Sequence, residues 1–318
     1  KIQEARNILL VPHIKPDGDA LGSVTAFIQF LRSIEKPHCA FCATPIPEKL
    51  KGLPNTEHIS SDISVLNNNY DLIIVFDSGN LHLTGIEKQI KNLNNKSQII
   101  NIDHHLSNDL FGNYNLVVAD SCSTTEVLHD FFIHNDIIID PTMATCLLTG
   151  LITDTNFFTN SSTSIKSLNI SAKLVEIGGN SRLIKELIFK DRTIGFLKIH
   201  GLILSRLKNH AQLDLAYSYV TNEDLQKYTI SESSIVEIVN FMNNLKGIKA
   251  FLIFKESNDG KIKGSLRTNC DDIDVNLIAQ KIGGGGHKKA AAFIVDGPLK
   301  RAAKEVFDKI IATGCLNK

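Results

Sequence analysis

Short apolar runs that end in polar loops recur along the first half of the chain. Residues 8–11, 72–76 and 99–102 are almost continuously apolar, which is typical of parallel strands buried on both faces. The segment 20–34, between the first two runs, places its apolar residues at helical spacing. This alternation predicts an α/β domain with a parallel sheet and helices on both faces.

Three later segments of the first half are predicted to be helices. Residues 123–133 begin with Ser-Thr-Thr-Glu, which resembles a capped helix start. Residues 141–152 are apolar and long enough for a helix, and the helical pattern of 164–177 ends at two glycines. Residues 180–208 are amphipathic, and we expect them to be helical as well.

The second half of the chain has a different pattern. Residues 250–254 and 261–266 flank the sequence Asn-Asp-Gly, which predicts a β-hairpin. The other elements expected here are a strand at 213–220, an apolar segment at 290–295, and helices at 235–245, 275–282 and 298–311, the last with a proline in its first turn. Strands and helices do not alternate regularly, so a smaller mixed α+β domain is predicted.

A chain of 318 residues is long enough for two domains. We expect an N-terminal domain at 1–185, a helical connector at 186–208 and a C-terminal domain at 209–318, with a cleft between the two domains. No apolar stretch is long enough to span a membrane and no signal-peptide pattern opens the chain, so a cytoplasmic protein is expected.

Composition narrows the choice of partners. The formal net charge is zero, whereas proteins that coat long duplex DNA usually carry a basic excess. This balance of positive and negative charges favours small anionic substrates over long duplex DNA. Six cysteines follow no disulfide framework, and the C-x-x-C pair of Cys39 and Cys42 has no second pair that would indicate a metal or redox site.

Ligand-type side chains follow the apolar runs of the first half. These residues are His13, Asp17, Asp19, Asp77, Asp103, His104, His105 and Asp154. The carboxyl ends of parallel strands share one edge of a sheet, where ligands bind, so these side chains should converge. Carboxylates gathered in this way repel one another unless cations neutralise them. The pattern therefore predicts a metal centre.

The residue types suit two metal ions that act on a phosphoester. The hypothesis assigns His13, Asp17 and Asp77 to one ion. It assigns Asp19, Asp77, His104 and Asp154 to the other. Ligands of oxygen and imidazole type without cysteine favour Mn²⁺, with Mg²⁺ or Co²⁺ possible.

Two neighbouring residues have expected roles outside the ligand set. His105 could hydrogen-bond the phosphate or protonate the leaving group. Asp103 could orient an imidazole.

Each motif alone has a simpler interpretation. An isolated Asp-His-His is often a loop or a helix cap, Asp77 could belong to a turn, and Asp154 could cap a helix. Only their joint placement after successive apolar segments favours a metal centre. The histidines without such a context are expected to be surface or packing residues: His38, His58, His82, His129, His134, His200 and His210.

A glycine-rich loop in the second half is a candidate substrate-binding segment. Four glycines precede His287, and their backbone N–H groups could approach an anion closely. We expect Gly284, Gly285, Gly286 and His287 to bind substrate, with a following helix N-terminus as a possible further contribution. The loop lacks the Gly-Lys-Ser/Thr ending of a Walker loop, and a flexible loop is the simpler alternative.

Two arginines are further candidates for phosphate binding. Arg267 ends a predicted strand and offers a planar, forked donor. Arg192, in the connector, is a weaker candidate.

Together these residues resemble the DHH phosphoesterase superfamily. The spacing His13-x3-Asp17-x-Asp19 resembles its first motif, and Asp77, Asp103-His104-His105 and Asp154 resemble the next three. Gly284-Gly285-Gly286-His287 resembles the signature of its associated C-terminal domain. Two positions depart from the usual pattern, Asn156 and Ala292, where many relatives carry glycine.

The length and the C-terminal loop resemble the nano-RNase group, the bifunctional oligoribonucleases and pAp phosphatases. This resemblance implies Mn²⁺-dependent hydrolysis of di- to pentaribonucleotides to mononucleotides, and of pAp to AMP and phosphate. It also implies that Arg267 and His287 hold the far end of the substrate. A homodimer is possible.

Two other functions remain open, and two more are disfavoured. One is a phosphodiesterase for cyclic or linear dinucleotides such as c-di-AMP, pApA or pGpG. Another is a RecJ-like exonuclease on longer single strands, which would be expected to carry a more basic groove. A family pyrophosphatase is disfavoured because its Ser-Arg-Lys signature is missing. A nucleotide-binding module with a decayed site is disfavoured by the intact ligand residues.

Overall fold

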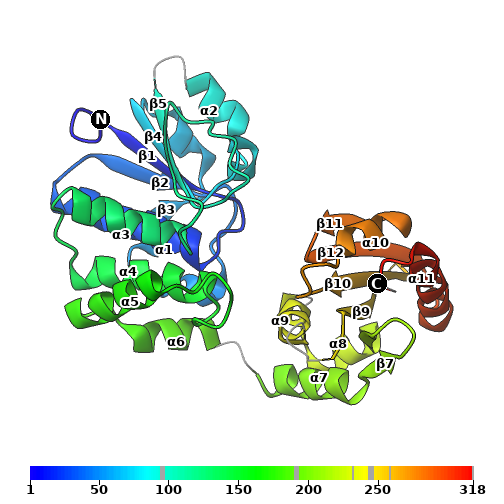
Figure 1. Cartoon of the computed structure of the whole chain (residues 1–318). Helices are drawn as coiled ribbons and strands as arrows, with labels where there is room; N and C mark the ends of the chain where they lie inside the picture. The colour runs from blue at the N-terminus through cyan, green and yellow to red at the C-terminus, as the bar shows by residue number, and fades with distance from the viewer. Residues whose placement is uncertain (94–96, 190–192, 231–232, 243–246, 258, 317–318) are drawn as a thin grey trace. The chain divides into compact units, whose positions relative to one another are not determined.

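The computed structural model describes residues 1–93, 97–189, 193–230, 233–242, 247–257 and 259–316 (Figure 1). Contacts divide the chain into two compact units, Lys1–Asp191 and Arg192–Lys318. The expected boundaries at 185/186 and 208/209 stay predictions, and each unit is described by itself.

The first unit is built on a parallel sheet of six strands in the order β3-β2-β1-β4-β5-β6. The strands are β1 (Ile8–Pro12), β2 (His38–Phe41), β3 (Ile59–Ser60), β4 (Leu72–Phe76), β5 (Gln98–Asp103) and β6 (Tyr114–Val117). The first strand of the chain lies inside the sheet, and the strand order reverses between β1 and β4. In sheets of this kind, such a reversal marks the place where ligands bind.

Helices cover both faces of this sheet, as predicted. One face packs against α1 (Gly18–Ser33), α3 (Thr124–His134) and α4 (Pro141–Asp154), and α5 (Ile165–Ile177) and α6 (Ser181–Phe189) lie against α4. The other face packs against η3 (Ile63–Asn67), η4 (Leu81–Thr84) and α2 (Glu87–Leu93). Two further turns are η1 (Glu48–Leu50) and η2 (Thr56–His58). In β1, Ile8 and Leu10 enter the first core, whereas Leu9 and Val11 enter the second.

The second unit contains a mixed sheet of six strands in the order β11-β12-β10-β9-β8-β7. The strands are β7 (Lys208–His210), β8 (Leu215–Val220), β9 (Ala250–Glu256), β10 (Lys261–Arg267), β11 (Gly285–His287) and β12 (Ala290–Asp296). Only β8 and β9 pair in parallel, so this unit is the mixed domain that the sequence predicts.

Helices also cover the sheet of the second unit. One core includes α10 (Val275–Lys281) and α11 (Leu299–Thr313). The core on the other face includes α7 (Ile194–Ser205), α8 (Asn222–Tyr228) and α9 (Ser233–Met242). No helix among the described residues is both long and apolar enough to cross a membrane.

Three details differ from the sequence-based expectations. The segment expected to be one helical connector contains α6, α7 and the strand β7, and α7 buries Ile199 and Ile203 in the core of the second unit. Pro298 is the N-cap of α11 rather than part of its first turn. The predicted helix 235–245 is described as far as Met242, and its last residues lie outside the described part.

The glycine-rich loop differs as well. No helix follows it, because Gly285–His287 forms β11 and pairs with β12. A helix dipole therefore does not contribute to anion binding at this loop.

Candidate metal centre

The loop after β1 brings the first ligand-type residues to the carboxyl edge of the sheet. His13 directly follows β1, and Asp17 is the N-cap of α1, where its Oδ1 accepts hydrogen bonds from the N–H groups of Asp19 and Ala20. The cap fixes the start of α1, and it places Asp19 in the first turn of the helix with its side chain fully buried.

Asp77 lies between the two imidazoles of the cluster. It directly follows β4 with φ at +54°, a left-handed conformation that Asp tolerates better than most residues. Its Oδ2 is 3.6 Å from His13 Nε2, and its Oδ1 is 3.7 Å from His104 Nε2. One buried carboxylate therefore faces both histidines, as a bridging ligand would.

Both histidines are held in the same orientation by backbone carbonyls. His13 Nδ1 lies 2.7 Å from the carbonyl oxygen of Ile14, and His104 Nδ1 lies 3.2 Å from that of Ser121. An Nδ1–H that donates to a carbonyl leaves the lone pair on Nε2, and this arrangement is typical of metal-binding histidines. In both residues, Nε2 is the nitrogen that points at the carboxylates.

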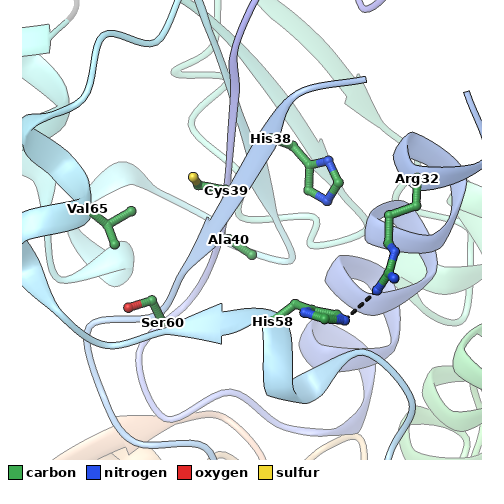
Figure 2. A pocket seen from close by; sticks show the side chains of 7 residues that line it. All are labelled: Arg32, His38, Cys39, Ala40, His58, Ser60 and Val65. Carbon is green, nitrogen blue, oxygen red and sulfur yellow. Dashed lines mark hydrogen bonds between the residues drawn. The ribbon is translucent and has the colours of Figure 1, made fainter. Parts of the chain in front are cut away.

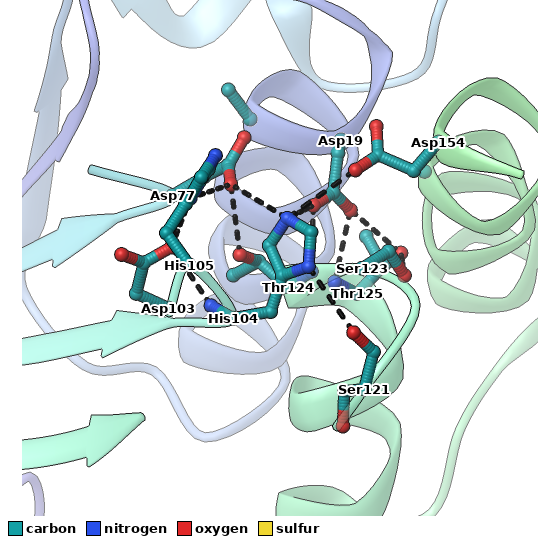
Figure 3. Close-up of polar contacts among 12 residues, drawn as sticks. Asp19, Asp77, Asp103, His104, His105, Ser121, Ser123, Thr124, Thr125 and Asp154 are labelled. Atoms are coloured by element: carbon teal, nitrogen blue, oxygen red, sulfur yellow. Dashed lines mark hydrogen bonds and ion pairs between the residues drawn. The ribbon is translucent and has the colours of Figure 1, made fainter. Parts of the chain in front are cut away.

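The start of α3 holds the carboxylate of Asp19 (Figure 3). Asp19 Oδ2 accepts a hydrogen bond of 2.6 Å from the N–H of Thr124. Its Oδ1 accepts bonds from the N–H and the hydroxyl of Thr125, at 3.0 and 2.8 Å. The helix dipole of α3 further stabilises the negative charge. Gly150 of α4 leaves room for it, because a Cβ there would lie 2.3 Å from Asp19 Oδ1.

Asp154 completes the cluster as the last residue of α4, so it ends a helix rather than following a strand. Its Oδ2 is 3.3 Å from His104 Nε2, which is also 4.0 Å from Asp19 Oδ2. In the described ranges, three groups of side chains have atoms close enough to share a metal ion: His13 with Asp17 and Asp77, Asp19 with His104 and Asp154, and Asp77 with His104 and His105.

A left-handed turn follows Asp154. Asn156, Phe157 and Phe158 have φ values of +48°, +59° and +60°. Glycine adopts this conformation freely and Asn tolerates it, which accounts for Asn156 at a position where the resemblance leads one to expect glycine.

The cluster attracts protons strongly, which is the electrostatic signature of a cation site. Burial alone would lower the pKa of His13, but hydrogen bonds with Asp17 and Asp77 raise it to about 11. The pKa of His104 is raised to about 10, because the hydrogen bond with Asp154 and nearby carboxylate charges outweigh burial. In each case the carboxylates stabilise a positive charge beside them.

The pKa values of two buried carboxyl groups are raised as well. Burial is the main reason that the pKa of Asp19 lies well above its usual range, and the charges of Asp154 and Asp77 raise it further. Burial also raises the pKa of Asp154, to about 6. These buried carboxylates need a compensating cation, and their oxygen and nitrogen donors suit a hard or borderline divalent metal.

His105 differs from its neighbour His104. Its Nδ1 lies 2.7 Å from Oδ1 of Asp103. The same Oδ1 accepts a hydrogen bond from the N–H of His104, and Oδ2 of Asp103 accepts one from the side chain of Asn108. The hydrogen bond with Asp103 is the main cause of a raised pKa for His105. The His105 side chain is 47% exposed, so it can approach a bound molecule while Asp103 orients it.

The structure adds several supporting residues that the sequence pattern does not indicate. The sequence places Thr124 and Thr125 only at a helix start, whereas their N–H and hydroxyl groups bind Asp19 and Asp77. Ser121, Gly150 and Asn108 are three more such residues. Two signals were available in the sequence. One is the run of hydroxyl residues at the start of a helix, and the other is a glycine inside a helix. Neither signal indicates which residue it would contact.

The other predicted substrate-binding residues lie in the second unit. Register pairs Arg267 with Ala290 and Ala290 with His287, so these three residues form a row on one face of the sheet. Phe251, beside Arg267 in the register, belongs to the core that α7 and α9 cover on this face. Along this row, the small Ala290 separates a guanidinium from an imidazole.

The glycines of this loop allow close strand packing. A Cβ on Gly284 would lie 2.1 Å from the carbonyl oxygen of Ala292, and one on Gly286 would lie 2.5 Å from that of Ala290. Gly285 pairs with Ala292, and a Cβ there would lie 3.9 Å from Asn276 Oδ1, an ordinary contact distance. Lys289 is not a free phosphate donor, because it binds Asp271 and the carbonyl of Cys270. Arg192 lies outside the described residues.

None of the histidines expected to be surface or packing residues belongs to the groups of described side chains that could share a metal ion. Figure 2 shows His38 and His58 at a pocket of 290 Å³ on the β2–β3 edge, where Arg32 contacts His58. Cys39 also lines this pocket, and Cys39 and Cys42 are both free.

The fold and the cluster define a protein with an N-terminal α/β domain, whose sheet edge is suited to metal cations, and a second mixed domain. Residues 7–151 match the sequence model of the DHH family, N-terminal domain, and residues 212–313 match that of the DHHA1 domain. The chain therefore belongs to the DHH family, whose phosphoesterases depend on metals.

Similar proteins cover nearly the whole chain. An uncharacterized protein of Mycoplasma genitalium is 28% identical over 93% of this chain and 89% of its own length. The bifunctional oligoribonuclease and PAP phosphatase NrnA of Thermus thermophilus is 25% identical over 95% of this chain and 89% of its own length. The crystal structure of an exopolyphosphatase-related protein from Bacteroides fragilis has the same fold, with a TM-score of 0.86, 24% identity, and coverage of 100% of this chain and 95% of that one.

Proposed function

We propose that this protein is a metal-dependent phosphoric ester hydrolase that cleaves short oligoribonucleotides to mononucleotides, and pAp to AMP and phosphate. The observation that carries the proposal is the paired orientation of His13 and His104. Each donates Nδ1–H to a backbone carbonyl and directs Nε2 at the carboxylate of Asp77, which lies between them.

Two sets of residues would hold two Mn²⁺ ions. His13, Asp17 and Asp77 form one set. Asp19, Asp77, His104 and Asp154 form the other, and Asp77 is shared between them. Bound in this way, the ions would supply an activated water and neutralise charge on the phosphoryl oxygens.

The remaining residues orient groups and move a proton. Thr124 donates its hydroxyl to Asp77 Oδ1, and Thr124 and Thr125 fix Asp19, so the ligands are held before any ion binds. Asp103 raises the pKa of His105, and His105 is the group that would donate a proton to the leaving oxygen.

The substrate class is supported by the second unit and by the relatives. Arg267 is suited to a phosphate, because its guanidinium is a planar fork of donors. The small side chain of Ala290 leaves the space between Arg267 and His287 open for a planar base or a sugar. The name of the Thermus thermophilus relative includes the same two activities. All six cysteines are free, which suits a reducing cytoplasm.

Replacement of Asp77 tests this proposal. Asp77→Asn keeps the shape of the side chain and its tolerance for positive φ, but removes the charge that would bridge the ions. With Mn²⁺ present, we expect phosphodiester turnover to fall at least about a hundredfold and metal binding to weaken. Asp136→Asn is the matched control, since Asp136 is exposed and has φ at +53°. Near-normal turnover by Asp77→Asn would contradict the proposal.

A further inference from the structure

A pocket of 740 Å³ lies within the second unit, between the helix α11 and the strands β7, β8 and β9. Its volume is within the range of about 300–1,000 Å³ that is usual for small-molecule sites. Tyr217, Tyr219, Phe254 and Phe307 line it, together with charged residues at both ends of the lining segment of α11.

This pocket is on the opposite face of the sheet from the row of Arg267, Ala290 and His287. Tyr217 pairs in register with Leu252, which pairs with Leu266, and Leu266 directly precedes Arg267 on β10. Successive residues of a strand point to opposite faces. The pocket is therefore separate from the substrate-binding residues proposed above.

Aromatic rings form the wall of the pocket. The Phe307 ring centroid lies 4.8 Å from that of Tyr217 and 5.8 Å from that of Phe254, with interplanar angles of 64° and 90°. The ring centroid of His210 also lies 4.8 Å from that of Phe307. Tyr217 and Tyr219 are partly exposed, and nucleobases stack on accessible aromatic faces whatever their sequence.

Cations and carboxylates share this pocket with the rings. Lys300 and Lys304 are one turn apart on α11, and Lys208 is opposite Tyr217 in the sheet register. Within the part of the chain that the structure describes, none of these lysines has an ion-pair partner. Asp308, one turn beyond Lys304, adds a hydrogen-bond acceptor, and Glu256 adds another.

We propose that this pocket is a second nucleotide site, which binds a nucleoside monophosphate without cleaving it. The base would stack on the ring of Tyr217, with the inclined ring of Phe307 beside it. The phosphate would be held by Lys300 and Lys304. The carboxylates would accept hydrogen bonds from the ribose hydroxyls. A purely apolar ligand would leave the three lysines and two carboxylates unused. The inference stands on these residues alone, and it does not require the catalytic proposal to be correct.

Tyrosine fluorescence gives a direct readout, because the chain has no tryptophan and two of its five tyrosines line the pocket. The whole protein is titrated with AMP in the presence of a chelator, so that metal-dependent cleavage does not occur. Saturable quenching by AMP, with weaker binding of adenosine and of ribose 5-phosphate, is the expected result. Equal binding of AMP and ribose 5-phosphate would overturn the role of the rings, and with it the proposal.

Variants locate the binding. Lys304→Gln should weaken AMP binding by about tenfold, the usual loss for one charge-assisted phosphate contact. Lys309→Gln is the matched control, since Lys309 is on the same helix but pairs with Glu305 outside the pocket. Arg267→Ala should leave the quenching unchanged. Tyr217→Leu should reduce the preference for AMP over ribose 5-phosphate.

Two results would contradict the proposal. One is equal AMP affinity in the Lys304→Gln and Lys309→Gln variants. The other is loss of quenching in Arg267→Ala, which would place the nucleotide on the other face of the sheet.

Discussion

At the scale of single residues, two adjacent imidazoles have different environments. His104 donates Nδ1–H to a backbone carbonyl and directs Nε2 at three carboxylates, whereas the Nδ1 of His105 is taken by Asp103. The sequence predicted both histidines as functional and assigned them different roles. It could not supply the tautomer, because the carbonyl of Ser121 comes from a later loop.

Variants of His104 and His105 test these different roles, and each variant is the comparison for the other. His104→Gln should lower the number of Mn²⁺ ions bound per chain and abolish turnover, because it removes a ligand. His105→Gln should keep the bound metal but reduce turnover by about 10²–10⁴-fold, the usual contribution of a general acid. Bound metal is measured after gel filtration, alongside the rate. Metal loss in His105→Gln as large as in His104→Gln would make His105 a ligand instead.

At the scale of helices and strands, the long apolar elements were predictable, whereas the edge strands and the short inner strand β2 were not. β1 and β4 are continuous apolar runs, and β5 has three isoleucines, because both faces of the sheet are covered. β3 has only two residues, and β6 carries polar residues among apolar ones, so neither shows a periodic pattern. The contact between α3 and Asp19 was not predictable either, because it joins segments that are more than 100 residues apart.

A mutation of Gly150 tests how closely α4 packs against this contact. Gly150→Ala would place a Cβ 2.3 Å from Asp19 Oδ1 and from Thr125 Oγ1. We expect a loss of about 1–3 kcal/mol in the free energy of unfolding, as is usual for overpacking, and weaker metal binding. Urea unfolding of the metal-free protein and Mn²⁺ titration measure the two effects.

Gly201→Ala is the matched control, because nothing lies within 4 Å of a Cβ at this exposed position of α7. This change should raise stability by about 0.5–1 kcal/mol, since glycine is unfavourable inside a helix. If Gly150→Ala behaved in the same way, Asp19 would not be confined as described.

At the scale of the whole molecule, the chain combines a DHH domain with the candidate metal centre and a DHHA1 domain with a separate set of side chains that we propose to bind phosphate. The change in pattern along the sequence predicted two domains of different class. It did not predict the row formed by Arg267, Ala290 and His287, because that row depends on the pairing of three strands.

Because the two sets of side chains are in different domains, we expect the effect of a mutation in the second domain to depend on the size of the substrate. His287→Ala should reduce cleavage of a dinucleotide by about tenfold or more, because one hydrogen bond to a charged group is lost. Cleavage of bis-p-nitrophenyl phosphate, a small generic diester, should change little. Steady-state rates on both substrates decide the matter, and equal losses would mean that His287 does not hold the remote end of the substrate.

The most direct test of the central claim is a set of parallel turnover assays with Mn²⁺. The substrates are a 5′-phosphorylated RNA dinucleotide, pAp, pyrophosphate and cyclic-di-AMP. The account predicts rapid release of mononucleotide from the dinucleotide and cleavage of pAp, with the Asp77→Asn variant inactive on both. An inert dinucleotide together with rapid cleavage of pyrophosphate or of cyclic-di-AMP would contradict it.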